Sequence, residues 1–382
     1  MQAFLQTLLI LLCFGPLATA WTVPTTNPPA RVIWETTGDS WLECITQRSN
    51  GDLLITRYDT GEIWTVNTKT LQRSLVHRFP PSSNVNSSLG IVEYEDDVFA
   101  FNGGQTSPPD RNPIAGSWSA WSIDLRGWTP FCNETETVTP SPPITRLTAI
   151  PEAGTLNGLT VLQPATTTGP RANGKKASPL LLLADSKKGI IYQVSPTAAN
   201  KSARVLYSNP ELLTPPPNSL FPVGLNGLQA PPVHKPAFVY FTGGARGTFY
   251  KLALSHTTVA VGAEPELIVG GFANLDDFAL EADGTAYLST GISNEIVRVS
   301  PQGAQTVVYK GTLISLSTAT LLVENRGSKV LYVNTGRPPG YPTAQPGAAV
   351  TLPMPQRLEK KLKHCCGTWW RFLVIYVIGT WQ

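Results

Sequence analysis

Six stretches of the chain open in the same way, and this repetition constrains the fold more than any other feature of the sequence. Each stretch has an apolar run, a turn containing Gly, Asn or Asp, and a second apolar run rich in Val, Ile, Leu, Tyr and Phe. Periods of about 40–50 residues, lengthened by loop insertions, are typical of β-propeller blades. We therefore predict an all-β chain that folds as a six-bladed β-propeller over residues 21–355. Aligning the openings, with intervals of 46, 68, 69, 50 and 40 residues, places these positions in register: Glu43, Leu89, Asn157, Asn226, Asp276 and Leu316.

The clearest repeat indicates how each blade is built. "LDDFALEADGTAYLSTGISNEIVRVSP" contains a strand, an Asp-Gly turn, a second strand, a Gly-Ile-Ser-Asn turn and a third strand. "WLECITQRSNGDLLITRYDTGEIWTVN" has the same order, with Asn-Gly in place of Asp-Gly. A ring of blades must also close, since closure removes exposed strand edges. We expect "RVIWET" near the beginning or "GAAVTL" near the end of the propeller to complete the last blade.

Four of the aligned positions are polar, although they lie in apolar runs. The first strand of each propeller blade lines the central channel, so aligned residues meet around one axis. Buried amides and carboxylates need partners, because an unpaired buried polar group costs roughly 1–3 kcal/mol. We therefore predict a ring of two carboxylates and two amides, contributed by Glu43, Asn157, Asn226 and Asp276.

An alternative interpretation applies to each acidic or amide residue taken singly. Asn and Asp often bond to nearby backbone and form turns. At the ring positions this interpretation has as much weight as a functional one. We favour it for four further residues, Asp97, Asp185, Asp277 and Asp283.

The predicted ring has two chemical uses. Carboxylate and amide oxygens suit Ca²⁺, Mg²⁺ or Mn²⁺, and Glu43, Asn157 and Asp276 are the candidate ligands if a metal is bound. Without a metal, the same groups can hold and polarise an organic substrate through hydrogen bonds, with apolar walls around it. We expect a small organic molecule as the partner and no cofactor, with Ca²⁺ or another divalent cation as the alternative.

Composition and missing motifs exclude several other classes. The net charge of +3 comes without a cluster of Lys and Arg, which argues against nucleic-acid binding. No Cys/His spacing suggests zinc, and Gly-x-Ser-x-Gly, His-Glu-x-x-His and P-loop motifs are absent from the sequence. None of the four histidines falls in an aligned channel position, which disfavours a His-based hydrolase. We expect a buried thiol at Cys44, with a Cys44–Cys132 disulfide as the alternative.

The two ends of the sequence differ from the propeller region. Residues 1–20 combine an apolar run with Ala18-Thr19-Ala20, the pattern of a secretory signal peptide. Three Asn-x-Ser/Thr sequons, at Asn86, Asn133 and Asn200, predict glycosylated surface loops, which fits a secreted or lumenal protein. Residues 356–382 form a basic and apolar tail, and the apolar run after Arg371 is too short to span a bilayer. The tail could be an interfacial anchor, a packing segment or a gene-model artefact. The sequence leaves the oligomeric state open.

The openings also carry a family resemblance. "ECI…SNGDLLIT", "LNGL…LLLADSKKGIIYQV" and "DDFALEADGTAYLS" resemble the gluconolactonase-like, senescence-marker-protein-type propellers over most of residues 41–336. In the lactonase branch, a Glu, an Asn and an Asp bind a divalent metal. The resemblance places these roles at Glu43, Asn157 and the position held here by Asn226. Replacing a carboxylate by an amide weakens a hard-cation site, so this departure counts against metal-dependent lactone hydrolysis.

"WLECITQRSNGDLLIT" is similar to the opening of a fungal secreted branch that includes hetero-Diels-Alderases of tropolonic sesquiterpenoid biosynthesis. The resemblance implies an enzyme that joins a quinone methide to a humulene-type terpene. Such a reaction needs a dry pocket and hydrogen-bond donors, for which we expect catalytic roles for Glu43, Asn157, Asn226 and Asp276. Candidate substrate-binding aromatic residues are Trp41, Phe272 and Phe278. The alternatives are a metal-dependent lactonase and a non-catalytic ligand-binding propeller.

Overall fold

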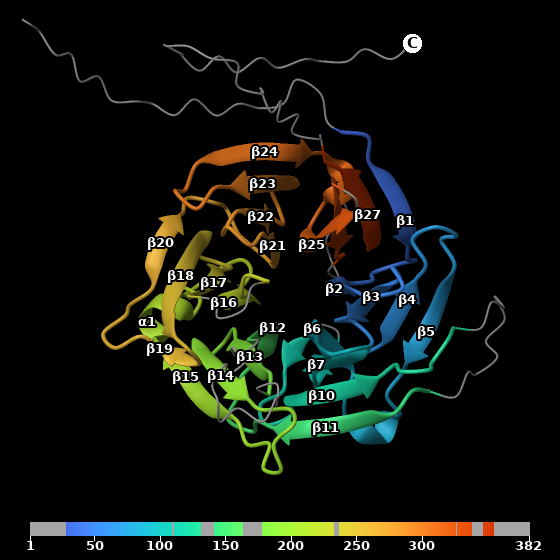
Figure 1. Cartoon of the computed structure of the whole chain (residues 1–382), viewed down its shortest axis with the longest axis horizontal. Coiled ribbons are helices and arrows are strands. Elements are labelled where there is room, and N and C mark those ends of the chain that lie inside the picture. The colour runs from blue at the N-terminus through green and yellow to red at the C-terminus, as the bar shows by residue number, and fades with distance from the viewer. Residues whose placement is uncertain are drawn as a thin grey trace, which may run out of the picture.

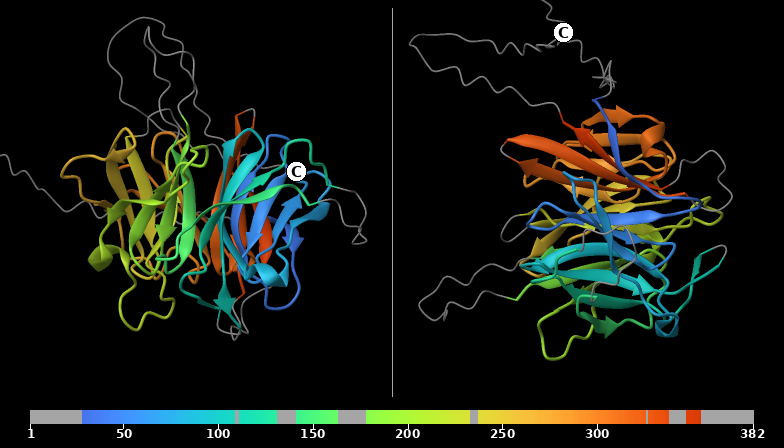
Figure 2. Two further views of the ribbon diagram at one scale, coloured as in Figure 1. Left: turned by 90° about the horizontal axis from the view of Figure 1, so that it is seen from below. Right: turned by 90° about the vertical axis from the view of Figure 1, so that its right-hand side faces the viewer.

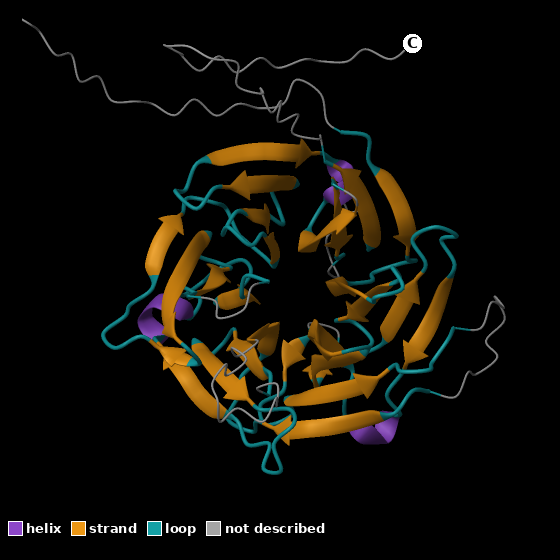
Figure 3. Ribbon diagram, in the orientation of Figure 1, coloured by secondary structure: helices purple, strands orange, loops and turns teal. Residues whose placement is uncertain are grey.

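Six antiparallel sheets surround a central axis in the computed structural model of the chain (Figure 1). The structure describes residues 28–108, 111–130, 141–162, 178–232, 237–325, 327–337 and 347–354. Nearly all of the regular structure is strand (Figure 3). The inner strands run roughly along the central axis (Figure 2), whereas outer strands such as β11 and β24 lie across it (Figure 1). The predicted six-bladed β-propeller is confirmed.

Each of the first five blades is built from consecutive stretches of the chain. Blade 1 contains β2 (Leu42–Gln47), β3 (Leu53–Arg57), β4 (Ile63–Val66) and β5 (Arg73–His77). Blade 2 contains β6 (Ser87–Glu95), β7 (Val98–Gly104), β10 (Ser119–Asp124) and β11 (Ile144–Ala149), with the small hairpin β8 (Thr106–Ser107) and β9 (Asn112–Pro113) beside it. Blade 3 contains β12 (Leu156–Leu162), β13 (Leu180–Asp185), β14 (Ile190–Val194) and β15 (Arg204–Ser208).

Blade 4 contains β16 (Leu225–Gln229), β17 (Phe238–Gly243), β18 (Thr248–Ser255), β19 (Thr258–Val259) and β20 (Glu266–Val269). Blade 5 contains β21 (Phe278–Leu280), β22 (Ala286–Ser289), β23 (Glu295–Val299) and β24 (Gln305–Lys310). Three short helices, η1 (Pro81–Ser83), α1 (Pro210–Leu213) and η2 (Thr312–Ile314), lie in connecting segments.

The sixth blade closes the ring with strands from distant parts of the sequence. It contains β25 (Ser317–Asn325), β26 (Ser328–Thr335), β27 (Ala348–Pro353) and β1 (Arg31–Glu35). Strand β1 is the outermost and pairs antiparallel with β27, where Arg31 lies opposite Thr351. Both segments that the sequence offered for closure therefore belong to the same blade. Their pairing joins the beginning of the propeller to its end and leaves no open seam between blades.

Apolar side chains between neighbouring blades form the core. Leu182 of blade 3 packs with Leu228 and Phe241 of blade 4, and all three are fully buried. Neighbouring blades cover both faces of these strands. The second strand of blade 3, β13, therefore has an almost continuously apolar sequence, LLLLAD. Burying a large apolar side chain stabilises the fold by about 1.5–3 kcal/mol. The blades therefore hold one another in place, and the polar residues of the channel stand on a rigid support.

Three sequence-based predictions concern single residues outside the aligned ring. Cys44 is buried, as expected, and its thiol is free. Asn200 is exposed in a loop. The Asn86 amide nitrogen instead donates to the Thr106 backbone oxygen at 2.9 Å, and this contact differs from the freely exposed loop we expected for that sequon.

Other predictions lie outside the described residues. They are the signal peptide at residues 1–20, the sequon at Asn133, the partner thiol Cys132 and the tail at residues 356–382. None of the described helices is long and apolar enough to cross a membrane.

Candidate functional site

The inner strands of blades 1, 3 and 4 share an irregularity that turns polar residues out of the ladder. Leu156 pairs with Asp185 and Leu159 with Leu183, and the shift in register between them contains Asn157 and Gly158. The same shift occurs between Leu225 and Leu228, and between Leu42 and Ile45. The repeated Leu-Asn-Gly-Leu therefore marks a β-bulge, in which the leucines enter the core and the asparagine leaves the strand pairing.

The glycine in this motif allows neighbouring blades to approach closely. A Cβ atom at Gly158 would lie 2.3 Å from the backbone oxygen of Asn226 in the next blade. At Gly227 it would lie 2.6 Å from Oδ1 of Asp277. Both distances are far below van der Waals contact, so a larger residue cannot stand at either position unless the inner strands move apart.

The structure brings part of the predicted ring together. Asp276, Asn226 and Leu316 line one pocket. Glu43 lies behind the pocket, 5% exposed, and its Oε2 atom accepts a hydrogen bond from the indole nitrogen of Trp41. Asn157 is also buried, but it is absent from the pocket lining, and its backbone oxygen accepts from the amide of Asn102 at 2.7 Å.

Three carboxyl groups lie near one another at this site without a basic partner. They belong to Glu43, Asp276 and Asp277, and none of the ion pairs in the described part of the chain involves them. Burial of charge without compensation favours the protonated form of a carboxyl group. In this cluster, the protonated form of the carboxyl groups is therefore favoured up to a higher pH than is usual for Asp and Glu.

The pKa values of the three carboxyl groups all shift upwards. Burial raises the pKa of Glu43 to about 8, opposed by the hydrogen bond from Trp41 and increased by the charge of Asp277. Burial raises the pKa of Asp276 well above its usual range, and the charges of Glu43 and Asp277 add to this effect. Burial also raises the pKa of Asp277 to about 6, against hydrogen bonds from the Phe278 backbone, Cys44 and Gln229. This upward shift favours the protonated form of Asp276, which can donate a hydrogen bond.

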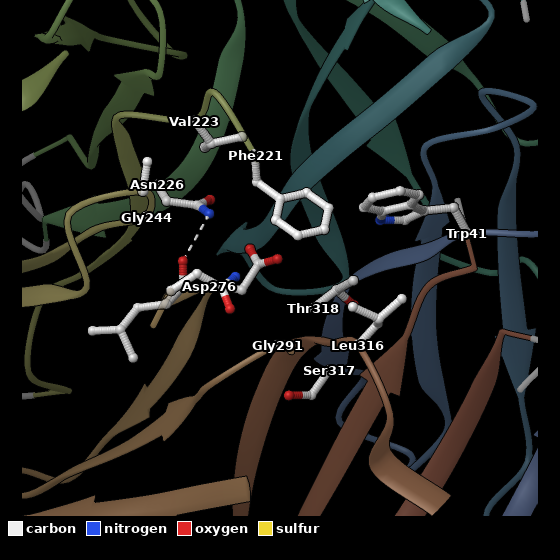
Figure 4. A pocket seen from close by; sticks show the side chains of 13 residues that line it. Trp41, Phe221, Val223, Asn226, Gly244, Asp276, Gly291, Leu316, Ser317 and Thr318 are labelled. Atoms are coloured by element: carbon white, nitrogen blue, oxygen red, sulfur yellow. Dashed lines mark hydrogen bonds between the residues drawn. The ribbon is translucent and has the colours of Figure 1, made fainter. Parts of the chain in front are cut away.

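The pocket beside this cluster is small and has aromatic walls. Its volume is about 60 Å³, compared with roughly 300–1,000 Å³ for pockets that enclose a drug-sized ligand. Figure 4 shows the rings of Trp41 and Phe221 and the carboxyl group of Asp276 turned towards the same space. A space of this volume can enclose only one end of a small molecule.

The predicted aromatic residues have different positions. Trp41 lines the pocket as expected. Phe278 is instead fully buried and packs edge-on against Phe249, with ring centroids 5.0 Å apart. Phe272 packs against the same core cluster. The structure therefore places Phe278 in the core of blades 4 and 5, because the inner strand β21 turns its side chain towards the neighbouring blade. Phe272 lies half-buried in the segment before β21, and both phenylalanines are outside the pocket lining.

Two residues of the site were missed by sequence reasoning. We assigned Asp277 to a turn, but its carboxyl group is buried with Cys44, whose thiol donates to Oδ2 at 3.4 Å. The signal was the alignment itself, because Asp277 directly follows the aligned position Asp276. Phe221 lies in an irregular segment rich in Pro and Asn, and no periodicity marks it.

A divalent cation can be tested against the donor atoms of the site. Within the described ranges, no three His, Cys, Asp or Glu side chains lie close enough together to hold a metal ion. Two carboxyl groups, from Glu43 and Asp276, would need amide oxygen as a further ligand. Asn226 Oδ1 is buried without a hydrogen-bond partner, while its amide nitrogen donates to the Leu275 backbone oxygen at 3.3 Å. This unpaired oxygen and the carboxyl group of Asp276 line the same pocket, and both are donors of the kind that a hard cation binds.

Fold and site together define a six-bladed β-propeller with an acidic pocket in its channel. The structure is similar to a calcium-binding regucalcin from Agrobacterium tumefaciens, with a TM-score of 0.58 and 13% identity, covering 87% of this chain and 96% of that one. A luciferin-regenerating enzyme has a TM-score of 0.57 and 10% identity, covering 85% and 95%. A putative gluconolactonase has a TM-score of 0.52 and 11% identity, covering 87% and 93%.

Comparisons at the level of sequence give no further assignment. No family model matches the chain, and no curated protein matches it. At 10–13% identity the solved structures establish the shared fold alone. The expected likeness to gluconolactonase-like propellers is therefore confirmed for the fold.

Proposed function

We propose that the channel pocket is the active site of an enzyme that acts on a small organic molecule. The observation that carries this proposal is the position of Asp276, which lines the pocket beside Trp41 and Phe221 and has its pKa raised well above the usual range. A neutral carboxylic acid in a site with little water can donate a hydrogen bond to a carbonyl oxygen that gains negative charge in the transition state.

The reaction that best fits this donor is a cycloaddition. In a hetero-Diels–Alder reaction, a quinone methide and an alkene form two new bonds in one step, and no group leaves. The protein must hold both partners in a reactive orientation and stabilise charge on the quinone-methide oxygen. Asp276 supplies the donor and the aromatic walls exclude water. The likeness of the opening "WLECITQRSNGDLLIT" to the fungal hetero-Diels-Alderase branch supports the same reaction.

The test is to incubate the purified protein with a quinone-methide precursor and a humulene-type alkene. We expect one stereoisomer, formed faster than without protein, and loss of this acceleration in Asp276→Ala. Product at the uncatalysed rate and stereochemistry would refute the cycloaddition. Removing one positioned donor of this type typically lowers kcat by about 10²–10³-fold, so the effect of the variant is easily measured.

Lactone hydrolysis is the second candidate, favoured by the unpaired oxygen of Asn226, which lines the pocket together with Asp276. These two side chains would hold a divalent cation. When bound, such a cation polarises a carbonyl group and lowers the pKa of water. The similarity of the fold to a putative gluconolactonase supports this candidate. Metal analysis after dialysis, followed by assays on aldonolactones with and without chelator, tests it, and activity in a metal-free protein would exclude the metal-dependent form.

A further inference from the structure

We propose that Trp41 is a fixed aromatic shelf for a planar, conjugated ring that bears a carbonyl group, and that Glu43 and Gly336 are positioning residues that hold this shelf. The inference rests on the proposed function, since the carbonyl group of that ring is the acceptor for Asp276. It adds the class of ring that the pocket selects and the reason why a buried acid lies behind the pocket wall.

The indole of Trp41 is held on three sides, by Glu43, Tyr58 and Gly336. Its nitrogen donates to Oε2 of Glu43. Its ring packs against Tyr58, with centroids 5.5 Å apart and planes inclined by 59°. The Tyr58 hydroxyl in turn donates to the backbone oxygen of Arg111 at 2.7 Å, which fixes the supporting ring. Trp41 therefore has little freedom to turn away from the pocket.

Gly336 completes the support from the sixth blade. Trp41 and Gly336 form an isolated antiparallel bridge. A Cβ atom at position 336 would lie 2.8 Å from Cδ2 of the indole, 2.9 Å from Cε2 and 2.9 Å from Nε1. These distances are below normal contact, so any side chain at position 336 would displace the indole. The absence of a side chain at Gly336 therefore sets the position of the shelf.

Glu43 has no direct access to a ligand in the pocket. It is buried, it is absent from the pocket lining, and its carboxyl group accepts a hydrogen bond from the indole nitrogen of Trp41. A buried carboxyl group without a cation destabilises the fold. The presence of the Glu43 carboxyl group is explained if its role is to orient the indole of Trp41. Glu43 thus acts through Trp41.

The remaining walls indicate what the shelf receives. Phe221 and Leu316 line the same pocket, and Asp276 provides the hydrogen-bond donor. Flat apolar surfaces stack well on flat rings, and an aromatic pair contributes stability beyond its buried area. A saturated, puckered ring cannot make this contact across its whole face. The pocket therefore favours a planar ring whose carbonyl oxygen points to Asp276.

The first experiment compares two ketones that differ only in the ring. Acetophenone has a planar ring, and 1-cyclohexylethanone has a saturated one. Calorimetry or saturation-transfer NMR on the full chain should give about two- to tenfold tighter binding for acetophenone, the range expected for one aromatic contact. Equal affinity for the two ketones would overturn the proposal.

The second experiment tests the positioning roles through that preference. Glu43→Gln keeps an oxygen acceptor for the indole and should retain the preference, whereas Glu43→Leu removes the acceptor and should abolish it. Glu43→Leu also removes an uncompensated buried acid, so its Tm should be unchanged or higher. A lost preference in a protein of undiminished stability separates positioning from a merely structural role. Gly336→Ala should weaken acetophenone binding by a similar factor.

A matched control lies outside the pocket. The indole nitrogen of Trp64 donates to Oε2 of Glu62 at 2.8 Å, two positions away, as Trp41 does to Glu43. Trp64→Phe should leave the preference intact, while Trp41→Leu should abolish it. If Trp41→Leu still binds acetophenone more tightly than 1-cyclohexylethanone, the proposed role of Trp41 is wrong.

These outcomes are distinct from failure of the proposed function. A wild-type protein that prefers acetophenone in this way but catalyses neither candidate reaction would refute the enzyme assignment and leave the shelf in place. A protein that is active but binds both ketones equally would refute the shelf alone.

Discussion

The thiol of Cys44 lies 3.4 Å from Oδ2 of Asp277, although the two residues are 233 positions apart. Asp277 Oδ1 also lies 3.5 Å from the amide nitrogen of Gln229. These contacts link blades 1, 4 and 5 across the channel. Asp277 is therefore a central member of the polar network, and the site behaves as one electrostatic unit with Glu43 and Asp276.

The first prediction concerns the pH dependence of stability. The pKa of Glu43 rises from 4.5 to about 8 on folding, and that of Asp277 from 3.8 to about 6. The folded protein then binds more protons than the unfolded chain at intermediate pH, so these groups make stability fall as pH rises from about 4 to about 8. At about 1.4 kcal/mol for each pKa unit, the expected contribution over the full pH range is on the order of 5 kcal/mol for Glu43 and 3 kcal/mol for Asp277.

Urea unfolding at pH 5 and pH 8 measures this effect. Glu43→Gln and Asp277→Asn each remove one titrating group, so the loss of stability between the two pH values should be smaller than in the wild type. If both variants lose as much stability as the wild type does, the raised pKa values are contradicted.

The second prediction separates donation by Asp276 from its charge. Asp276→Asn keeps a hydrogen-bond donor and should retain part of the activity, whereas Asp276→Ala should lower kcat by about 10²–10³-fold. Steady-state kinetics with the substrates of the proposed reaction provides the measurement. An Asn variant as inactive as the Ala variant would indicate that the carboxyl group itself, or a cation bound to it, is required.

The third prediction tests the cation. Asn226→Asp adds a carboxylate beside Asp276 and should lower stability in chelator by about 1–3 kcal/mol through repulsion and burial of charge. If the site holds a divalent cation, CaCl₂ should raise the Tm of this variant more than that of the wild type. Asn157→Asp is the comparison, since Asn157 is absent from the pocket lining. A calcium response confined to Asn157→Asp would place the cation away from the pocket.

The fourth prediction concerns the contact between inner strands. Gly158→Ala places a methyl group 2.3 Å from the Asn226 backbone oxygen, so we expect a loss of about 2–3 kcal/mol. Gly270→Ala is the control, because its Cβ atom would meet Cγ2 of Thr248 at 3.3 Å, the end of a side chain. Chemical denaturation should show a much smaller loss there. Similar losses at both positions would contradict the role of the close interblade approach.

The fold could be predicted from the sequence because its signal is repeated six times. The buried leucines at Leu156 and Leu225 recur with their turns, and both proposed closing segments enter the same blade. The polar positions Asn226 and Asp276 could be placed in the channel for the same reason. A repeat predicts which residues share a level, because each blade positions its first strand alike.

The details of the site could not be predicted in this way. Phe221 reaches the pocket from an irregular segment, where no period applies. Phe278 is an aromatic residue of the kind that lines ligand pockets, but the geometry of its strand directs the side chain into the core. The acceptor for Trp41 depends on a side-chain direction that a pattern of residue types does not contain.

The pairing of β1 with β27 has a consequence for how the molecule reaches its native state. Residues 31–35 leave the ribosome among the first of the propeller, yet their partner strand at residues 348–353 is made last. Contacts of such long sequence separation form slowly. Strand β1 therefore stays without its partner until β27 has been synthesised, and during that interval its free edge is open to pairing with the wrong strand.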